Sequence, residues 1–287
     1  MSSNDLVACP AYAGLMISTT LASGELTRIF DSGGELPVLV LVHGLANSIE
    51  IWDRIVSRLS HRFRVIAFDL PGFGQASRPD ATYDATFFAD QLSALLDALK
   101  IQRAHLVGSS LGASVILRFS EHSLHRIDRA VLAAPGGFGP RTHPLMRLPA
   151  LPLVGDWLGR PTPFNNALTL KLAMCDPAQV TPELLELTNR YARVPGSERS
   201  FVRTLQTGVG LFGSKDCVGV ARIAQRLDRP TLIVWGRQDR VFPPVYAERA
   251  ATLLPRSSLC LIDRCGHYPH WEQPDAFATA VEEFLTQ

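Results

Sequence analysis

Short apolar runs alternate with longer stretches of helical spacing along most of the chain. From Gly24 onward the short runs are rich in β-branched residues, and the longer stretches repeat apolar residues every three or four positions. Leu92, Leu95, Leu96 and Leu99 form the clearest stripe, which we interpret as a helix face packed on a sheet. The alternation is typical of βαβ units and predicts an α/β fold, with a mostly parallel central sheet flanked by helices. The predicted strands are 38–42, 65–68, 105–107, 130–132, 232–235 and 259–262, and the predicted helices are 49–59, 85–99, 111–121, 245–254 and 274–284.

The alternation stops at Pro135-Gly136-Gly137 and resumes only at Pro230. The residues between contain many prolines and separate helical patches such as 182–193, so we interpret them as an insertion between two strands of the sheet. Six prolines between positions 140 and 163 oppose long helices, which predicts loops and short turns for the first third of the insertion.

The composition favours a folded protein that acts on a small molecule. Hydrophobic residues make up 46% and charged residues 19% of the chain, and 28 Lys and Arg against 27 Asp and Glu leave a net charge of +1. So balanced a charge offers no chain-wide attraction to nucleic acid or anionic lipid, so we expect neither as a partner. The expected partner is a small-molecule substrate, and the sequence leaves a homodimer open.

The cysteines and the amino end favour a cytoplasmic protein without a metal or cofactor. The five cysteines are scattered and form no CxxC pair, which is typical of reduced thiols with no metal or redox role. The first residues lack the basic start and the continuous apolar run of a signal peptide. The longest strongly apolar run, Val38 to Val42, is far shorter than the roughly 20 residues of a membrane helix, so no membrane span is expected.

The segment Gly108-Ser109-Ser110-Leu111-Gly112 has the pattern of a nucleophile elbow. It lies between a predicted strand and a predicted helix, which is the context that GxSxG requires. A nucleophile on so sharp a turn needs small neighbours, and the amino end of the helix adds positive potential. We therefore predict Ser110 as the catalytic nucleophile.

A serine hydroxyl reacts only when a base takes its proton, and His267 is the predicted base. His267 lies in Cys265-Gly266-His267, on the loop after the last predicted strand, at the sheet edge where open α/β sheets bind their ligands. The other histidines considered fall in predicted helix ends, in a strand or in the insertion, and we interpret them as structural: His61, His105, His122, His125 and His143.

Asp239 is the predicted acid that orients His267. It follows the predicted strand 232–235, and the 28-residue gap to His267 holds one helix and one strand, which returns the chain to the same edge. The order Ser, Asp, His is that of the hydrolases described by the elbow motif. Asp263 is the competing acid, but it lies only four residues before His267 and is better suited to stabilise the loop.

Acyl transfer also needs two N–H groups aimed at the developing oxyanion. The backbone N–H of Leu111 follows the nucleophile, and the loop His43-Gly44-Leu45 after the strand 38–42 offers the N–H of Leu45. These two groups form the predicted oxyanion hole. We expect the imidazole of His43 to brace that loop and not to react.

Taken in order, these motifs resemble those of the α/β-hydrolase superfamily across nearly the whole chain. The resemblance implies that residues 139–225 form a helical cap over the active site, while 1–138 and 226–287 form the core domain. It also implies a structural role for Asp69 to Ser77. The motifs are His43-Gly44, Asp69 to Ser77, the elbow at Ser110, Trp235 to Asp239, and Cys265-Gly266-His267.

Within the superfamily, the segments around Asp239, His267 and Trp271 are similar to those of the meta-cleavage-product hydrolases, which break carbon-carbon bonds in dienones. Simple carboxylesterases carry the same motifs. The dienone enzymes usually have Asn before the nucleophile, a glycine-rich loop after His-Gly and Trp after the catalytic His. This chain departs from them at all three places, with Ser109, the loop Leu45-Ala46-Asn47 and Tyr268.

Three further side chains are candidates for substrate binding. Arg190 lies where the dienone enzymes carry a cap arginine that holds the anionic end of the substrate, although a solvated helix arginine is the alternative. Ser109 and Trp271 are candidates from the elbow and from the segment after His267. No residue is predicted to bind a metal.

We therefore expect hydrolysis of small or medium carboxylic esters through an acyl-enzyme on Ser110. Cleavage of a carbon-carbon bond in 2-hydroxy-6-oxo-dienoates is the alternative. A non-catalytic ligand receptor on the same fold is a third hypothesis, which the complete set of Ser110, His267 and Asp239 disfavours.

Overall fold

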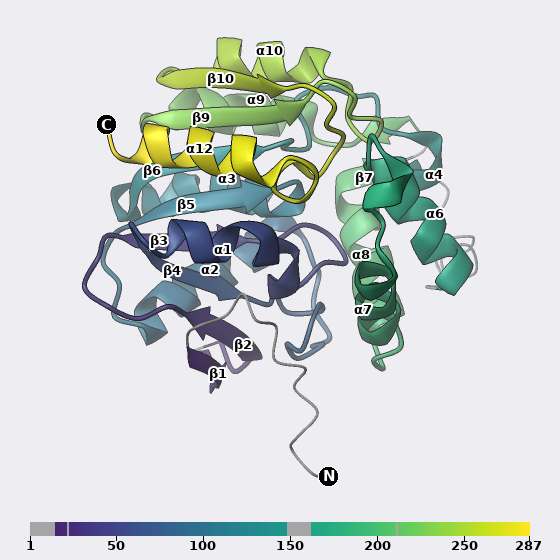
Figure 1. Ribbon diagram of the computed structural model, residues 1–287, viewed down its shortest axis with the longest axis horizontal. Helices are drawn as coiled ribbons and strands as arrows, with labels where there is room; N and C mark the ends of the chain where they lie inside the picture. The colour runs from purple at the N-terminus through teal and green to yellow at the C-terminus, as the bar shows by residue number, and fades with distance from the viewer. Residues whose placement is uncertain (1–14, 22, 148–161, 211) are drawn as a thin grey trace.

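An eight-stranded sheet lies between two layers of helices, with a group of further helices beside one end of the sheet (Figure 1). The computed structural model describes residues 15–21, 23–147, 162–210 and 212–287. The strand order is β1-β2-β4-β3-β5-β6-β9-β10. β2 runs antiparallel to both of its neighbours, β1 and β4, and the six strands from β4 to β10 in this order are parallel to one another. The strands are β1 (Leu15–Thr20), β2 (Leu26–Asp31), β3 (Val38–Val42), β4 (Arg64–Phe68), β5 (Ala104–Ser109), β6 (Ile127–Ala133), β9 (Thr231–Gly236) and β10 (Ser257–Ile262).

Both faces of the sheet are buried, which explains the continuous apolar runs of its central strands. Along β3 the side chains of Leu39 and Leu41 enter one hydrophobic cluster, and those of Val40 and Val42 enter the other. α1 (Asp53–Leu59) and α12 (Pro274–Leu285) pack together on one face. The other face carries α2 (Ala85–Ala98), α3 (Leu111–Ser123), α9 (Cys217–Arg226) and α10 (Val245–Leu253).

The predicted α/β fold is confirmed, and each of the six predicted strands is a strand of the sheet. The antiparallel strands β1 and β2 were not predicted. The second of these carries Thr27, Arg28 and Asp31 among its apolar residues, and all three are buried. Their polar groups bond to residues far away in the sequence, such as Asp69 for Arg28. A local pattern of apolar residues cannot reveal such distant partners, so it does not predict β2.

Short helices that begin at threonine caps make up much of the insertion. Thr162 accepts a hydrogen bond from the Asn165 N–H and Thr181 accepts one from the Leu184 N–H, and each is followed by a proline in the first turn. The elements are α4 (Pro144–Arg147), α6 (Pro163–Ala173), a 3₁₀ turn (Pro177–Gln179), α7 (Pro182–Ala192), α8 (Ser197–Gly208) and the hairpin of β7 (Val209–Gly210) and β8 (Gly213–Ser214). We call α6, α7 and α8 the cap helices.

The insertion begins with the short helix α4 and is followed by α9, which packs on the core. Its predicted loops and short turns fit the single helical turn of α4, but positions 148–161 lie outside the described residues. The predicted boundary at residue 225 cuts through α9, whose Ile223 and Ala224 are buried in the core cluster beneath α3. On packing grounds, we propose that the insertion ends before Cys217. None of the helices in the described residues has the length and apolar character to cross a membrane.

Candidate active site

Ser110 lies on a strained turn between β5 and α3. Its φ is 52° and its ψ is −111°, a backbone conformation that is costly for a residue with a side chain. Gly108 and Gly112 make the turn possible. A Cβ on Gly112 would overlap the carbonyl oxygen of Val42, and one on Gly108 would lie 2.5 Å from the carbonyl carbon of Gly112. The glycines of the motif are therefore needed because backbone passes within contact distance of backbone.

Asp239 and His267 meet as the sequence predicts. The Asp239 Oδ2 lies 2.8 Å from the His267 Nδ1, and both side chains are buried. The other carboxylate oxygen of Asp239 accepts hydrogen bonds from the N–H groups of Val241 at 2.7 Å and Phe242 at 3.0 Å. A carboxylate so held favours the imidazole tautomer with hydrogen on Nδ1, which leaves Nε2 able to accept a proton.

The loop that carries His267 is held against the end of α6. The backbone N–H of His267 donates to the Ala173 carbonyl at 2.6 Å. The carboxylate of Glu272 accepts from the N–H groups of Gly266 at 2.9 Å and Cys175 at 2.6 Å. Burial raises the pKa of Glu272, and these backbone donors oppose that rise. Glu272 thus joins the histidine loop to the insertion.

The loop after β3 approaches Ser110 closely. A Cβ on Gly44 would lie 3.3 Å from the Ser109 carbonyl oxygen and 3.4 Å from the Ser110 Cβ. His43 braces this loop, because its Nδ1–H donates to the Gly44 carbonyl at 2.8 Å and its Nε2 accepts from the Leu70 N–H at 2.9 Å. Burial lowers the pKa of His43, which favours the neutral ring that this pair of bonds requires.

An ionic group of Arg28, Glu50 and Asp69 supports the same loop and contacts the cap helix α7. Asp69 accepts hydrogen bonds from the Ile49 N–H at 2.9 Å and the Arg28 Nε at 2.8 Å. The Arg28 Nη atoms donate to both oxygens of Glu50, at 2.7 and 2.8 Å, and the Tyr191 hydroxyl donates to Glu50 at 2.8 Å. Burial opposes the charge of Arg28, but the two carboxylates hold its pKa above the usual value. The implied structural role of Asp69 agrees with these bonds.

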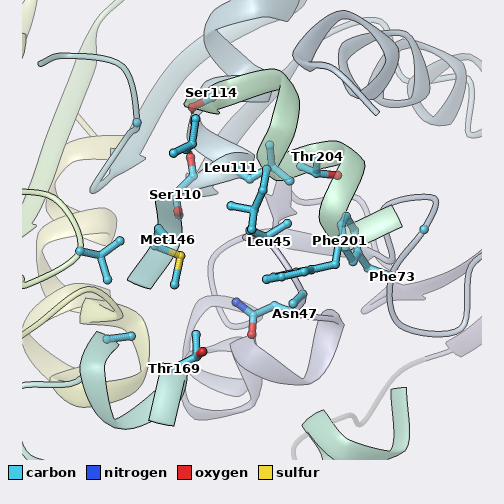
Figure 2. A pocket seen from close by; sticks show the side chains of 18 of the residues that line it. Leu45, Asn47, Phe73, Ser110, Leu111, Ser114, Met146, Thr169, Phe201 and Thr204 are labelled. Carbon is cyan, nitrogen blue, oxygen red and sulfur yellow. Dashed lines mark hydrogen bonds between the residues drawn. The ribbon is translucent and has the colours of Figure 1, made fainter. Parts of the chain in front are cut away.

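Ser110 and His267 both line one cavity of about 820 Å³. Leu45 and Leu111, whose N–H groups form the predicted oxyanion hole, line it as well (Figure 2). Met146, Phe73 and Phe201 line the same cavity (Figure 2). The wall is largely apolar, and its volume is in the range of small-molecule sites.

Three predicted substrate contacts lie outside the wall of this cavity, and their substrate roles stay predictions. Ser109 is fully buried beneath the elbow, and among the described residues its Oγ has no hydrogen-bond partner. Arg190 lies on the exposed side of α7 and is absent from the cavity wall. Trp271 is buried elsewhere, with its indole N–H donating to the Gln179 carbonyl at 3.1 Å and the Arg54 guanidinium over its ring.

The cap helices supply wall residues that sequence reasoning missed. Thr188 and Tyr191 on α7, Phe201 on α8 and Leu170 on α6 face the cavity, and Arg78 reaches it from the loop after β4. No local pattern marks these positions, because their facing depends on how the insertion lies on the core. Among the described residues, no cluster of three or more His, Cys, Asp or Glu side chains could hold a metal ion.

Comparison with known proteins places this chain in a family. The sequence profile of the family described as "alpha/beta hydrolase fold" matches residues 37–274, and the chain belongs to that family. A 2-hydroxy-6-oxo-2,4-heptadienoate hydrolase from Pseudomonas putida is 32% identical over 273 residues, covering 92% of this chain and 94% of the relative. A 2-hydroxymuconate semialdehyde hydrolase from a Pseudomonas species is 30% identical, covering 93% of each chain.

A solved structure carries the same resemblance. The meta-cleavage product hydrolase from Pseudomonas fluorescens IP01 superimposes with a TM-score of 0.80 at 30% identity, covering 94% of this chain and 97% of that one. The chain is therefore an α/β hydrolase similar to hydrolases of dienone substrates, as the sequence motifs suggest.

Proposed function

We propose that this protein hydrolyses a carbon-carbon bond in 2-hydroxy-6-oxo-dienoates, with Ser110 as nucleophile, His267 as base and Asp239 as the acid that orients the base. The observation that carries the proposal is the buried Asp239–His267 pair, whose imidazole opens on the same cavity as Ser110. The names of relatives that match nearly the whole chain support this substrate class over simple esters. It is the alternative of the sequence analysis, now preferred.

The reaction follows from the roles of these groups. In the 2-keto tautomer of the substrate, Ser110 Oγ attacks the C6 carbonyl while His267 Nε2 takes the hydroxyl proton. The N–H groups of Leu45 and Leu111 stabilise the resulting oxyanion. The C5–C6 bond then breaks, C6 remains on Ser110 as an ester, and the electron pair moves through the C3–C4 double bond to the C2 oxygen. His267 returns the proton to give a 2-hydroxy-dienoate. Water activated by His267 then hydrolyses the ester.

Ester hydrolysis is the second candidate function, and it uses the same groups. It is favoured by the departures at Ser109, Asn47 and Tyr268 from the residues usual in dienone enzymes. Of these three, Asn47 and Tyr268 line the cavity. The two functions differ in the leaving group, a dienolate in one reaction and an alcohol in the other. The geometry of the nucleophile, base and acid is common to both.

A steady-state assay separates the two candidates. Wild type is given 2-hydroxy-6-oxo-hepta-2,4-dienoate and a series of p-nitrophenyl esters, with Ser110→Ala as the inactive variant and Ser109→Ala as its matched control. The proposal expects dienoate cleavage with the higher kcat/KM, and a loss of about 10⁴-fold or more in Ser110→Ala only. Fast Ser110-dependent ester cleavage with negligible dienoate turnover would make the protein a carboxylesterase.

A further inference from the structure

The cavity wall contains few charged side chains, and most of these are already balanced. Arg118 pairs with Glu121 at 2.6 Å and lies 3.7 Å from Asp216. Asp216 also accepts a hydrogen bond from the Gly219 N–H at the beginning of α9, and Asp84 caps α2 through the Phe87 N–H. These charges are already offset or held by the protein, although the buried Arg118 Nε has no hydrogen-bond partner among the described residues.

Arg78 differs from them, because among the described residues no carboxylate forms an ion pair with it. Its Nε donates to the Ser197 Oγ at 2.8 Å, and its Nη atoms donate to the Ala76 and Gly74 carbonyls at 2.6 and 2.8 Å. A guanidinium has five N–H donors, so these three bonds fix the group and leave two donors. The half-buried side chain lines the cavity.

The carboxylate whose charge acts most on Arg78 is that of Asp69. Asp69 already accepts hydrogen bonds from Arg28 and from the N–H groups of Ile49 and Gln75. It therefore offsets part of the charge of Arg78 at a distance and occupies neither of its free donors. Burial lowers the pKa of Arg78, which reflects a cation without a direct counter-charge.

The sheet order sets where Arg78 lies relative to the nucleophile. Ser77 donates its N–H to the Leu26 carbonyl at the beginning of β2, so the backbone of Arg78 lies near β2, three strands from β5. At the usual spacing of neighbouring strands, this is roughly 15 Å. The extended side chain covers part of that distance. The His267 loop follows β10, on the opposite side of β5.

This arrangement assigns the two halves of a substrate to two sides of Ser110. The leaving half must lie near His267, which protonates it, so the acyl half extends the other way along the cavity. We propose that Arg78 binds a carboxylate at the far end of an elongated acyl half, well separated from the carbonyl that Ser110 attacks. This inference rests on the proposed function only in placing the reacting carbonyl at Ser110.

Binding to the Ser110→Ala protein tests the inference without any turnover. The two probes are monomethyl suberate, which ends in a carboxylate, and dimethyl suberate, which is its neutral counterpart; calorimetry gives the Kd of each. We expect the monoester to bind about tenfold or more tightly than the diester. Arg78→Met in the same background should abolish this preference, Arg78→Lys should keep most of it, and Arg190→Met is the control that should leave it unchanged.

Several results would overturn the assignment. The first two are equal affinity for both probes, and a preference for the monoester that survives Arg78→Met. The other two are a preference for the monoester that is lost in Arg190→Met, and equal weakening of the binding of both probes by Arg78→Met. The last result would make Arg78 only a structural link between the core and α8. Should Arg78→Met fail to fold, Arg78→Gln provides the same test in the Ser110→Ala protein, and salt tests whether the preference is ionic. There, added NaCl should weaken binding of the monoester and spare the diester. Failure of the dienoate assay would leave this binding result unaffected.

Discussion

The loops at the carboxyl edge of the sheet and the cap helices enclose the same cavity, but they are held in different ways. In the loops, buried side chains bond to backbone, as Asp239 does to the N–H groups of Val241 and Phe242. The described cap helices meet the core largely through their own side chains, such as Tyr191 to Glu50 and Arg203 to the Ala81 carbonyl. The difference teaches that bonds to backbone position the predicted catalytic groups, while side chains of the cap helices shape the rest of the cavity.

The largest effect should come from disrupting the carboxyl edge of the sheet at the elbow. Gly112→Ala should destabilise the protein by about 3 kcal/mol or more, because the new Cβ would overlap the Val42 carbonyl oxygen and β3 would have to move. The control is Gly208→Ala at the end of α8, where a Cβ meets nothing within 4 Å and should be neutral or stabilise by up to about 1 kcal/mol. Urea unfolding measures both, and equal stability of the two variants would contradict the comparison.

A smaller effect should follow from loosening the cap. Tyr191→Phe removes the hydroxyl that donates to Glu50, a side chain that is largely shielded from solvent. In the variant, Glu50 keeps both hydrogen bonds from Arg28. The expected loss is about 1–3 kcal/mol of unfolding free energy, together with a higher KM, because Tyr191 lines the cavity. Tyr83→Phe, which loses bonds only with uncharged groups, the Pro79 carbonyl and the Ser200 side chain, is the comparison for the charged partner and should cost less. Wild-type stability in Tyr191→Phe would show that this contact does not anchor the cap.

At neutral pH the smallest effect comes from His270, which governs the acid stability of the core behind the histidine loop. His270 is fully buried against Trp52 and Phe277, and burial lowers its pKa to about 3. The unfolded chain binds one more proton at this residue between about pH 6.5 and 3, so the stability contributed by neutral His270 is complete above that window and falls with pH inside it. His270→Phe should flatten this fall by up to about 1.4 kcal/mol per pH unit. Unfolding in urea at pH 7, 6, 5 and 4 measures the slope, and an unchanged slope would contradict the expectation.

The sequence was informative where structure depends on local spacing. Six apolar runs predicted six strands of the sheet, and the gap between Asp239 and His267 predicted their contact, which is confirmed at 2.8 Å. The catalytic roles of Ser110, His267 and Asp239 stay predictions. The strand β2 escaped detection because buried Arg28 is stabilised by carboxylates distant in the sequence.

The sequence was least informative for the cap helices, because the direction of their side chains depends on how these helices pack on the core. Thr188 and Tyr191 are three residues apart and share the face of α7 that lines the cavity, while Arg190 between them points to solvent. The motif resemblance indicated an arginine in this part of the chain but not which way it faces. Arg78 shows the converse, since its place at the cavity depends on a contact with Ser197, 119 residues away, which no local pattern encodes.

The central claim is that Ser110 is the reacting nucleophile, and covalent labelling tests it most directly. A fluorophosphonate gives a stable adduct when the serine oxygen displaces fluoride, and tandem mass spectrometry identifies the modified residue. The account predicts one adduct per chain on Ser110, lost activity in proportion to labelling, and much slower labelling in His267→Ala. Full activity in fully labelled protein, or an adduct on another residue that accounts for the lost activity, would contradict it.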